Sequence, residues 1–173
     1  GGGTPFQKGM ARYREWFRDV EYQTLDVSDY YHPTIVGDIH ALPLAAASIP
    51  AILCKSVLEH VANPVKAIQE MHRVLVPGGK LLLYTHFIYP YHARQGVYED
   101  YFRFTEAGLY SIFREFSRVE IKKQGGWFLA LSFFLPFQAQ LRPFGESMAY
   151  LLDKLFRTER RSTTAGFYVY AVK

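Results

Sequence analysis

The stretch RVLVPGGKLLLYTHF, residues 73–87, joins a helical pattern to an apolar run with almost no loop between them. Proline cannot continue a helix, and glycine accepts the left-handed backbone of a helix C-cap, so Pro77-Gly78-Gly79 predicts the end of the helix. The apolar run that follows predicts a strand buried in the middle of a sheet. In an open α/β sheet ligands bind beyond the carboxyl ends of the strands, so His86 is expected to face a site.

The helix that leads into this join has clear signals at its start. Asn63 suits the N-cap, and Pro64 suits the first helical position, where a missing N–H costs nothing. Its expected apolar face consists of Val65, Ile68, Met71 and Leu75.

Strand and helix patterns alternate along the rest of the chain. Strands are expected at VEYQTLD, ending at Asp26, at TIVGD, ending at Asp38, and at AILCKS, ending at Ser56. Helices are expected over residues 8–18 and after a cap at Thr105, and RVEIKK and GFYVYAV form a last pair of strands. This order predicts one open α/β sheet with parallel strands and right-handed crossovers.

Composition narrows the class of protein. The 173 residues suit one domain, with 49% hydrophobic residues. Twenty basic and 16 acidic residues give +4, but they are scattered, so no nucleic-acid partner is expected. One cysteine, Cys54, excludes an internal disulfide and fits a reducing, cytoplasmic location. The first residues lack the basic and apolar segments of a signal peptide.

Two longer motifs resemble a known family. GDIHALPL, residues 37–44, and VLEHVANPVKAIQEMHRVLVPGGKLLL, residues 57–83, closely resemble the class I, Rossmann-like S-adenosylmethionine-dependent methyltransferases, in particular their small-molecule branch. The similarity runs over residues 20–121. It implies a mostly parallel α/β sheet with an antiparallel last strand, and S-adenosylmethionine as cofactor.

The resemblance also implies cofactor contacts. Asp26 would take the ribose hydroxyls, since a carboxylate accepts two hydrogen bonds, and Asp38 would lie near the adenine amino group. The Ile39 backbone would lie beside the ring, and Ser56 would line the methionine portion. Spacing alone leaves open that Asp26 is a strand-ending turn residue and that Asp38 is a cap.

Two features depart from the family pattern. Pro50 stands where members usually carry an aspartate. A strand tolerates proline at its first residue, so the fold is expected to survive this change. Gly1 and Gly3 stand where the family has its glycine-rich cofactor loop, but no strand precedes them. We therefore expect Gly1 and Gly3 to contact the cofactor in a chain that lacks its first strand. The alternative is that the three glycines are a cloning remnant.

The segment after His86 is rich in aromatic and polar residues, as an acceptor pocket would be. Methyl transfer needs positioning, and it needs a base only when the acceptor must lose a proton. The candidates for that base are His60, His86 and His92, although each of them also fits a structural role. The candidates for acceptor binding are Tyr89, Tyr101 and Arg103. Arg103 either pairs with Asp100 or holds an anionic acceptor. No metal is expected, since the histidines lack ligand spacing such as His-x-x-x-His.

Residues 124–165 are expected to form a helical insertion in a single domain spanning 1–173. WFLALSFFLPF, residues 127–137, is too short to span a bilayer. An amphipathic stripe follows, consisting of Met148, Leu151, Leu152, Leu155 and Phe156. This insertion predicts a helical lid over the sheet or a homodimer contact, or else a membrane-surface contact through residues 127–161.

The sequence therefore predicts methyl transfer from S-adenosylmethionine to a small-molecule, glycan-like or lipid-linked acceptor. The alternative is a non-catalytic binding or scaffolding domain with an incomplete cofactor loop. A dinucleotide-dependent dehydrogenase and a serine hydrolase are disfavoured, because Gly-x-Gly-x-x-Gly and Gly-x-Ser-x-Gly are both absent from the sequence.

Overall fold

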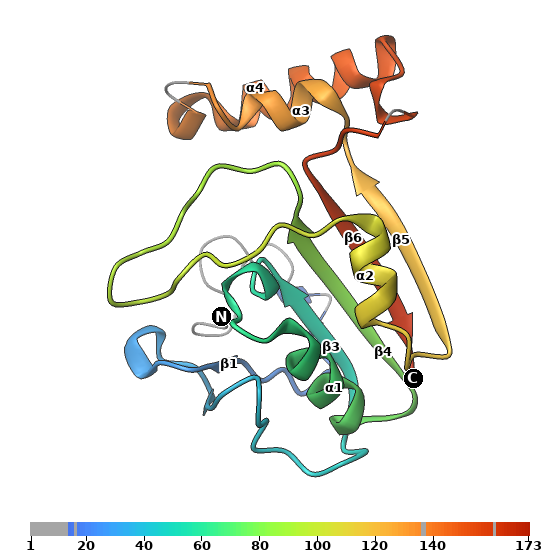
Figure 1. Ribbon diagram of the computed structural model, residues 1–173. Coiled ribbons are helices and arrows are strands. Elements are labelled where there is room, and N and C mark those ends of the chain that lie inside the picture. The colour runs from blue at the N-terminus through green and yellow to red at the C-terminus, as the bar shows by residue number, and fades with distance from the viewer. Residues whose placement is uncertain (1–13, 16, 136–137, 161) are drawn as a thin grey trace.

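A mixed four-stranded sheet forms the centre of the protein (Figure 1). The computed structural model describes residues 14, 15, 17–135, 138–160 and 162–173. The strand order is β3-β4-β6-β5. β3 and β4 are parallel, whereas β6 runs antiparallel to both β4 and β5, so the expected α/β class with a reversed last strand is confirmed. The strands are β3 (Ile49–Lys55), β4 (Leu75–His86), β5 (Arg118–Gln124) and β6 (Gly166–Val172).

The two earlier strands form a separate small sheet. β1 (Leu25–Asp26) and β2 (Ile35–Val36) pair in parallel, and within the described residues they are not hydrogen-bonded to the central sheet. The expectation of one continuous sheet is therefore wrong for this part. Just before this ladder, the Thr24 and Thr34 hydroxyls accept hydrogen bonds from each other's backbone N–H groups at 3.1 and 2.6 Å, respectively. A 3-10 turn, η2 (Asp29–Tyr31), lies between the two strands.

Helix α1 (Pro64–Val74) begins as predicted, with the Asn63 side chain accepting a hydrogen bond from the Lys66 N–H at 3.1 Å. It ends at Val74, before Pro77, so the predicted glycine C-cap is wrong. Leu75 is already extended and pairs with Ile49 of β3, which ends the helix at once.

The Pro-Gly-Gly segment instead interrupts the ladder between β3 and β4. The next residue of β3 in register, Ala51, pairs with Lys80, so residues 76–79 bulge out of the strand. Gly78 has a φ of +76°, which favours glycine, and its N–H donates to the Lys173 carbonyl at 3.1 Å.

Helices α1 and α2 (Glu106–Ile112) cover one face of the central sheet (Figure 1). The Thr105 hydroxyl caps α2 by accepting from the Gly108 N–H at 3.1 Å, as predicted. Val65, which was expected in the core, is 43% exposed, and Ala67 and Val74 are buried in its place. The core between helices and sheet includes Ile68, Met71, Leu81, Leu83, Leu109, Phe113 and Val169.

Among the residues that the structure describes, nothing fully covers the opposite face of the sheet at β3 and β4. Leu53 and Leu82 are register partners, and each is 46% exposed. The alternation of exposed and buried residues follows from the pleat, because successive side chains point to opposite faces. The prediction that both strands are buried on both sides is therefore wrong for this face.

Helices α3 (Trp127–Ser132) and α4 (Gln138–Leu155) pack against each other beyond the end of β5 and β6 (Figure 1). Met148, Leu151 and Leu155 are at least 53% exposed, so much of the apolar stripe faces solvent in this structure. None of the described helices combines the length and apolarity that crossing a membrane requires. The small core between the two helices is Leu129, Ala130, Phe133, Ala149 and Ala165.

The start of α3 is held by a carboxylate from α4. Asp153 is 1% exposed and accepts hydrogen bonds from the N–H groups of Gly126, Phe128 and Leu129 at 2.7, 2.9 and 3.2 Å. It also accepts from the Thr158 hydroxyl, in the 3-10 turn η4 (Thr158–Arg160). One buried side chain therefore binds most of the free donors at the N-terminus of this short helix.

Candidate functional site

Four of the predicted site residues follow the carboxyl ends of parallel strands. Asp26 ends β1 and Asp38 lies two residues after β2, and these two strands run in the same direction. Ser56 follows β3 and His86 ends β4, and the Ser56 N–H donates to the Tyr84 carbonyl at 2.9 Å. Ser56 has a φ of +52°, a strained conformation for a residue with a side chain.

Asp26 is a buried turn residue that organises the next strand end. Its side chain is almost fully buried, and Oδ1 accepts from the Ser28 N–H at 3.0 Å. Its backbone carbonyl accepts from the Gly37 N–H at 2.9 Å. The Gly37-Asp38 pair is thereby tied directly to the end of β1.

Asp38 is exposed and is held by His40, a residue that sequence reasoning did not single out. Asp38 Oδ1 accepts from the His40 N–H at 2.8 Å and from His40 Nδ1 at 2.7 Å, and the backbone hydrogen bond lowers the pKa of the carboxyl. His40 Nε2 accepts from the Asn63 N–H at 3.2 Å, so the ring proton is on Nδ1. Ile39, which lies between Asp38 and His40 in the sequence, is partly buried and packs against the central core.

The turn after β3, η3 (Leu58–His60), contributes a second residue that the prediction missed. Glu59 has no exposed surface, and its Oε2 accepts from the Thr85 hydroxyl at 2.9 Å. Its Oε1 lies 3.3 Å from His86 Nε2, and burial raises the pKa of the carboxyl. The sequence signal for Glu59 is its place in the Leu-Glu-His motif, in which only His60 was proposed as a site residue.

His86 is buried at the end of β4 and its tautomer follows from its neighbours. The Tyr84 hydroxyl donates its only hydrogen to Gln124 Oε1, so it accepts from His86 Nδ1, 3.1 Å away. The proton is therefore on Nδ1, and Nε2 carries a lone pair. Burial lowers the pKa of His86 to about 3, and the Tyr89 ring stacks on it with 3.9 Å between centroids.

His92 lies beside His86 and is fixed by Asp100. His92 Nδ1 is 3.0 Å from the Pro90 carbonyl and 3.2 Å from Asp100 Oδ2. Arg103 pairs with Asp100, with 2.7 Å between Nη2 and Oδ2, and this lowers the pKa of Asp100 to about 2. Of the two roles open to Arg103, the structure thus forms the ion pair.

His60 joins this group to a nearby cavity. Its ring centroid lies 4.7 Å from that of His92, and its Nδ1 is 2.6 Å from the Glu99 carbonyl. A cavity of about 300 Å³ opens beside it, lined by His60, Tyr101 and residues 96–99. The structure therefore brings together His60, His86, His92, Tyr89, Tyr101 and Arg103. Gly1 and Gly3 lie outside the described residues.

Comparison with known proteins agrees with this architecture. A family model described as a methyltransferase domain matches residues 9–83. A methyltransferase structure from Archaeoglobus fulgidus superposes with a TM-score of 0.60 and 9% identity, covering 94% of this chain and 81% of that chain. The chain has a class I methyltransferase fold. The fold that the resemblance implies is thus confirmed.

Two further structures share this methyltransferase fold. A putative sarcosine dimethylglycine methyltransferase from Galdieria sulphuraria gives a TM-score of 0.59 at 14% identity, covering 99% of this chain and 76% of that chain. An S-adenosylmethionine-dependent methyltransferase from Mesorhizobium loti gives a TM-score of 0.56 at 17% identity, covering 93% of this chain and 85% of that chain.

A stretch of 48 residues is 50% identical to an uncharacterized 37.1 kDa protein in transposon TN4556 of Streptomyces fradiae. That match covers 28% of this chain and 14% of the relative, so it spans a small part of that protein.

Proposed function

We propose that the chain binds S-adenosylmethionine along the carboxyl ends of β1, β2 and β3 and transfers its methyl group to a small-molecule acceptor. The observation that carries this proposal is the parallel pairing of β1 and β2, which brings Asp26 and Asp38 to one edge. Asp26 would accept hydrogen bonds from the ribose hydroxyls, and Asp38 would bind near the adenine amino group.

The remaining cofactor contacts follow from the same arrangement. The Ile39 backbone would lie beside the adenine, and Ser56, whose backbone is strained at the end of β3, would line the methionine portion. Contacts of Gly1 and Gly3 with the cofactor remain a prediction.

Methyl transfer is an in-line displacement at a sulfonium. A lone pair of the acceptor forms a bond to the methyl carbon while the sulfur–methyl bond breaks, which leaves neutral S-adenosylhomocysteine. The enzyme therefore gains most from positioning, and a base is needed only for a protonated acceptor. Burial lowers the pKa of His86 to about 3, so its imidazole is neutral but is a weak proton acceptor. His60 and His92 are the alternatives.

The acceptor would enter through the cavity beside His60 and Tyr101. Its flat aromatic walls with polar tips suit a small or glycan-like molecule. Tyr89 and Arg103 stay predictions as acceptor-binding residues, since neither lines this cavity and Arg103 is held in its ion pair with Asp100.

Calorimetry with S-adenosylhomocysteine tests cofactor binding. Asp26→Asn is the sharpest variant, since asparagine can keep the turn contact with the Ser28 N–H but loses the charge. We expect binding to the wild-type chain and at least a tenfold loss, about 1.4 kcal/mol, in Asp26→Asn. Asp19→Asn, at an exposed position, should bind as wild type. Absence of heat with the folded wild type would favour the non-catalytic scaffold.

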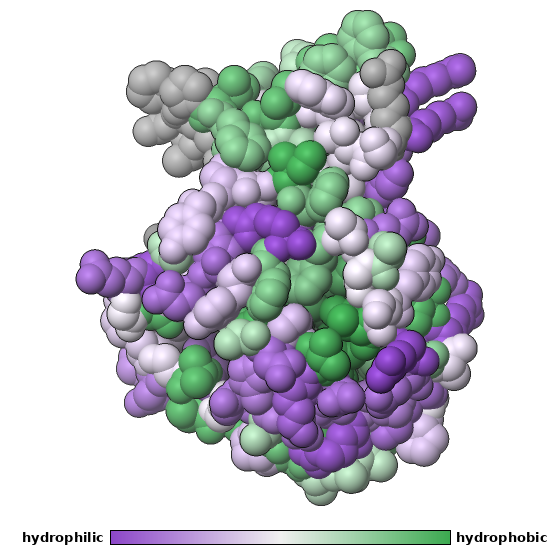
Figure 2. Space-filling view, in the orientation of Figure 1, coloured by the Kyte–Doolittle hydropathy of each residue, from purple (hydrophilic) through white to green (hydrophobic). Residues whose placement is uncertain are grey.

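A second proposal concerns the outer surface of α3 and α4. Figure 2 shows apolar side chains gathered over this part of the molecule, and Phe134, Leu135 and Leu155 are 55–70% exposed. Scattered exposed residues need no explanation, but a continuous apolar patch marks a contact surface. We propose that residues 127–161 rest on a membrane surface, which suits a lipid-linked acceptor, with a homodimer contact as the alternative.

A further inference from the structure

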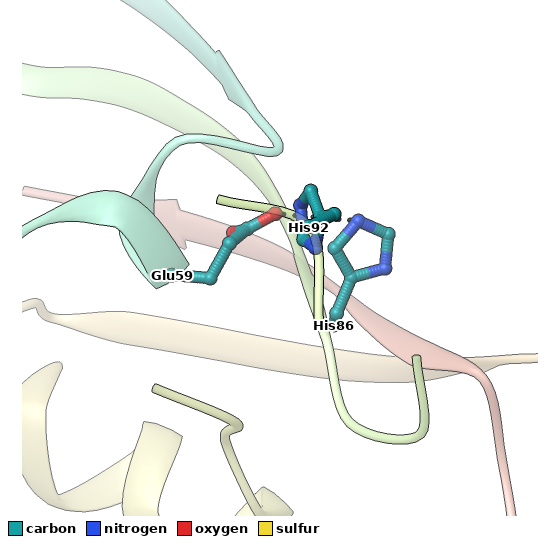
Figure 3. A group of neighbouring side chains, drawn as sticks. All are labelled: Glu59, His86 and His92. Atoms are coloured by element: carbon teal, nitrogen blue, oxygen red, sulfur yellow. Dashed lines mark ion pairs between the residues drawn. The ribbon is translucent and has the colours of Figure 1, made fainter. Parts of the chain in front are cut away.

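We propose that Glu59, His86 and His92 bind one divalent transition-metal ion, with Zn²⁺ the best match. Each residue offers one ligand atom, and these atoms lie within 4.8 Å of one another. Figure 3 shows the Glu59 carboxylate pointing from its turn toward the two imidazole rings. The ligands come from η3, from the end of β4 and from the segment after it, so no regular sequence spacing reveals them.

The hydrogen bonds leave two lone pairs facing each other. Glu59 Oε1 is buried and has no hydrogen-bond partner among the residues that the structure describes. His86 Nε2, 3.3 Å away, is also an acceptor, because Nδ1 carries the ring proton toward Tyr84. Two buried acceptors at this distance repel each other unless a cation or a proton lies between them.

The separation fits a metal ion. Zinc bonds to nitrogen and carboxylate oxygen are about 2.0–2.1 Å, and a tetrahedral angle then places two ligand atoms roughly 3.3–3.4 Å apart. The distance from Glu59 Oε1 to His86 Nε2 is 3.3 Å. The ligand atom of His92 lies within 4.8 Å of both, so a shift of its ring by about 1.6 Å or less completes the site.

Each ligand is held from behind by a second group. Glu59 Oε2 is bound by Thr85, and His86 Nδ1 by Tyr84. His92 Nδ1 lies near Asp100 and the Pro90 carbonyl, which leaves Nε2 as the nitrogen with a free lone pair. Such outer contacts fix the ring orientation and the tautomer of metal-binding histidines.

The ligand set selects the class of metal. Two imidazoles and one carboxylate suit zinc and similar transition metals, whereas magnesium prefers oxygen ligands alone. Three protein ligands leave a coordination position open for another molecule.

The role of the ion rests on the proposed methyl transfer, whereas its binding does not. An acceptor hydroxyl or thiol that binds the open position loses its proton to solvent. Its lone pair then forms the bond to the methyl carbon as the sulfur–methyl bond breaks. The site would thus favour acceptors with a hydroxyl or thiol that can reach the metal.

Equilibrium dialysis of the metal-stripped full chain against Zn²⁺, followed by elemental analysis, tests the site. We expect one zinc per wild-type chain, retained in excess Mg²⁺. Glu59→Gln and His92→Gln should each weaken binding at least tenfold. His72→Gln, on α1 and outside the cluster, should bind as wild type.

Several results would overturn this proposal. One is that the folded wild type takes up no zinc. Another is that the wild type and both variants take up zinc equally. If the variants do not fold, anomalous diffraction from the zinc-loaded wild type decides the matter, because a peak anywhere but at Glu59, His86 and His92 refutes the site. Calorimetry with S-adenosylhomocysteine on the metal-stripped chain tests the proposed function separately, so the two failures are distinguishable.

Discussion

Replacing Asp100 by asparagine should destabilise the protein in a way that depends on pH. The side chain of Asp100 is 1% exposed, pairs with Arg103 and accepts from the His92 N–H at 2.9 Å. These contacts lower its pKa from the ordinary value of 3.8 to about 2. One pKa unit is worth about 1.4 kcal/mol, so the charged form contributes about 2 kcal/mol to the free energy of unfolding.

The direction of the pH effect follows from the lowered pKa. The unfolded chain takes up a proton at Asp100 before the folded chain does, so this contribution is complete above pH 3.8 and is lost as the pH falls through about 2. Asparagine keeps an acceptor oxygen but has no charge. We therefore expect Asp100→Asn to lower the free energy of unfolding by about 2 kcal/mol at pH 7, and the difference from wild type to shrink below pH 4.

Urea unfolding of both proteins between pH 7 and pH 2.5 measures this difference, provided that the urea dependence of the two proteins is the same. Asp19→Asn, at an exposed position, is the matched control and should change stability by less than about 0.5 kcal/mol. Equal stability of wild type and Asp100→Asn at pH 7 would refute the reasoning. So would a difference that stays constant down to pH 2.5.

Two further predictions concern the helical segment. Asp153→Asn replaces the carboxylate that accepts hydrogen bonds from three backbone N–H groups, so the free energy of unfolding should fall by about 2–4 kcal/mol. Thermal unfolding measures this loss, with Asp19→Asn as the control. An unchanged unfolding midpoint would contradict the capping role. If the surface of α3 and α4 rests on membranes, the wild type and the control variant Val65→Glu should co-sediment with anionic liposomes. The double variant Phe134→Glu, Leu135→Glu should stay in the supernatant. Equal, negligible pelleting of all three proteins would remove the idea.

Local signals in the sequence predicted several elements correctly. The Asn63 and Thr105 caps act through hydrogen bonds within three residues, so a short window of sequence contains everything that determines them. Strands β3, β4 and β6 were found because their runs are apolar, and β5 because Val119 and Ile121 alternate with polar residues. The reversed last strand followed from the family resemblance and not from any local pattern.

Other features depend on partners that sequence order does not reveal. Pro77-Gly78-Gly79 looked like a helix end, but Leu75 had already left the helix to pair with Ile49 of β3. The exposed side of β4 at Leu82 could not be predicted, because an apolar run reads alike whether one or both faces are covered.

The candidate site shows the same division. Asp26, Asp38, Ser56 and His86 were found because strand ends can be located from sequence. Glu59 was missed because its importance comes from burial against His86, a contact that exists only in the folded chain.

The position of β6 between β4 and β5 has a consequence for synthesis. A nascent chain leaves the ribosome with β4 and β5 complete while the strand that bridges them is still inside the tunnel. Those two strands cannot be joined until β6 emerges and inserts between them. A chain truncated before Gly166 would therefore leave the sheet split in two, with the unpaired edges of β4 and β5 open to aggregation and proteolysis.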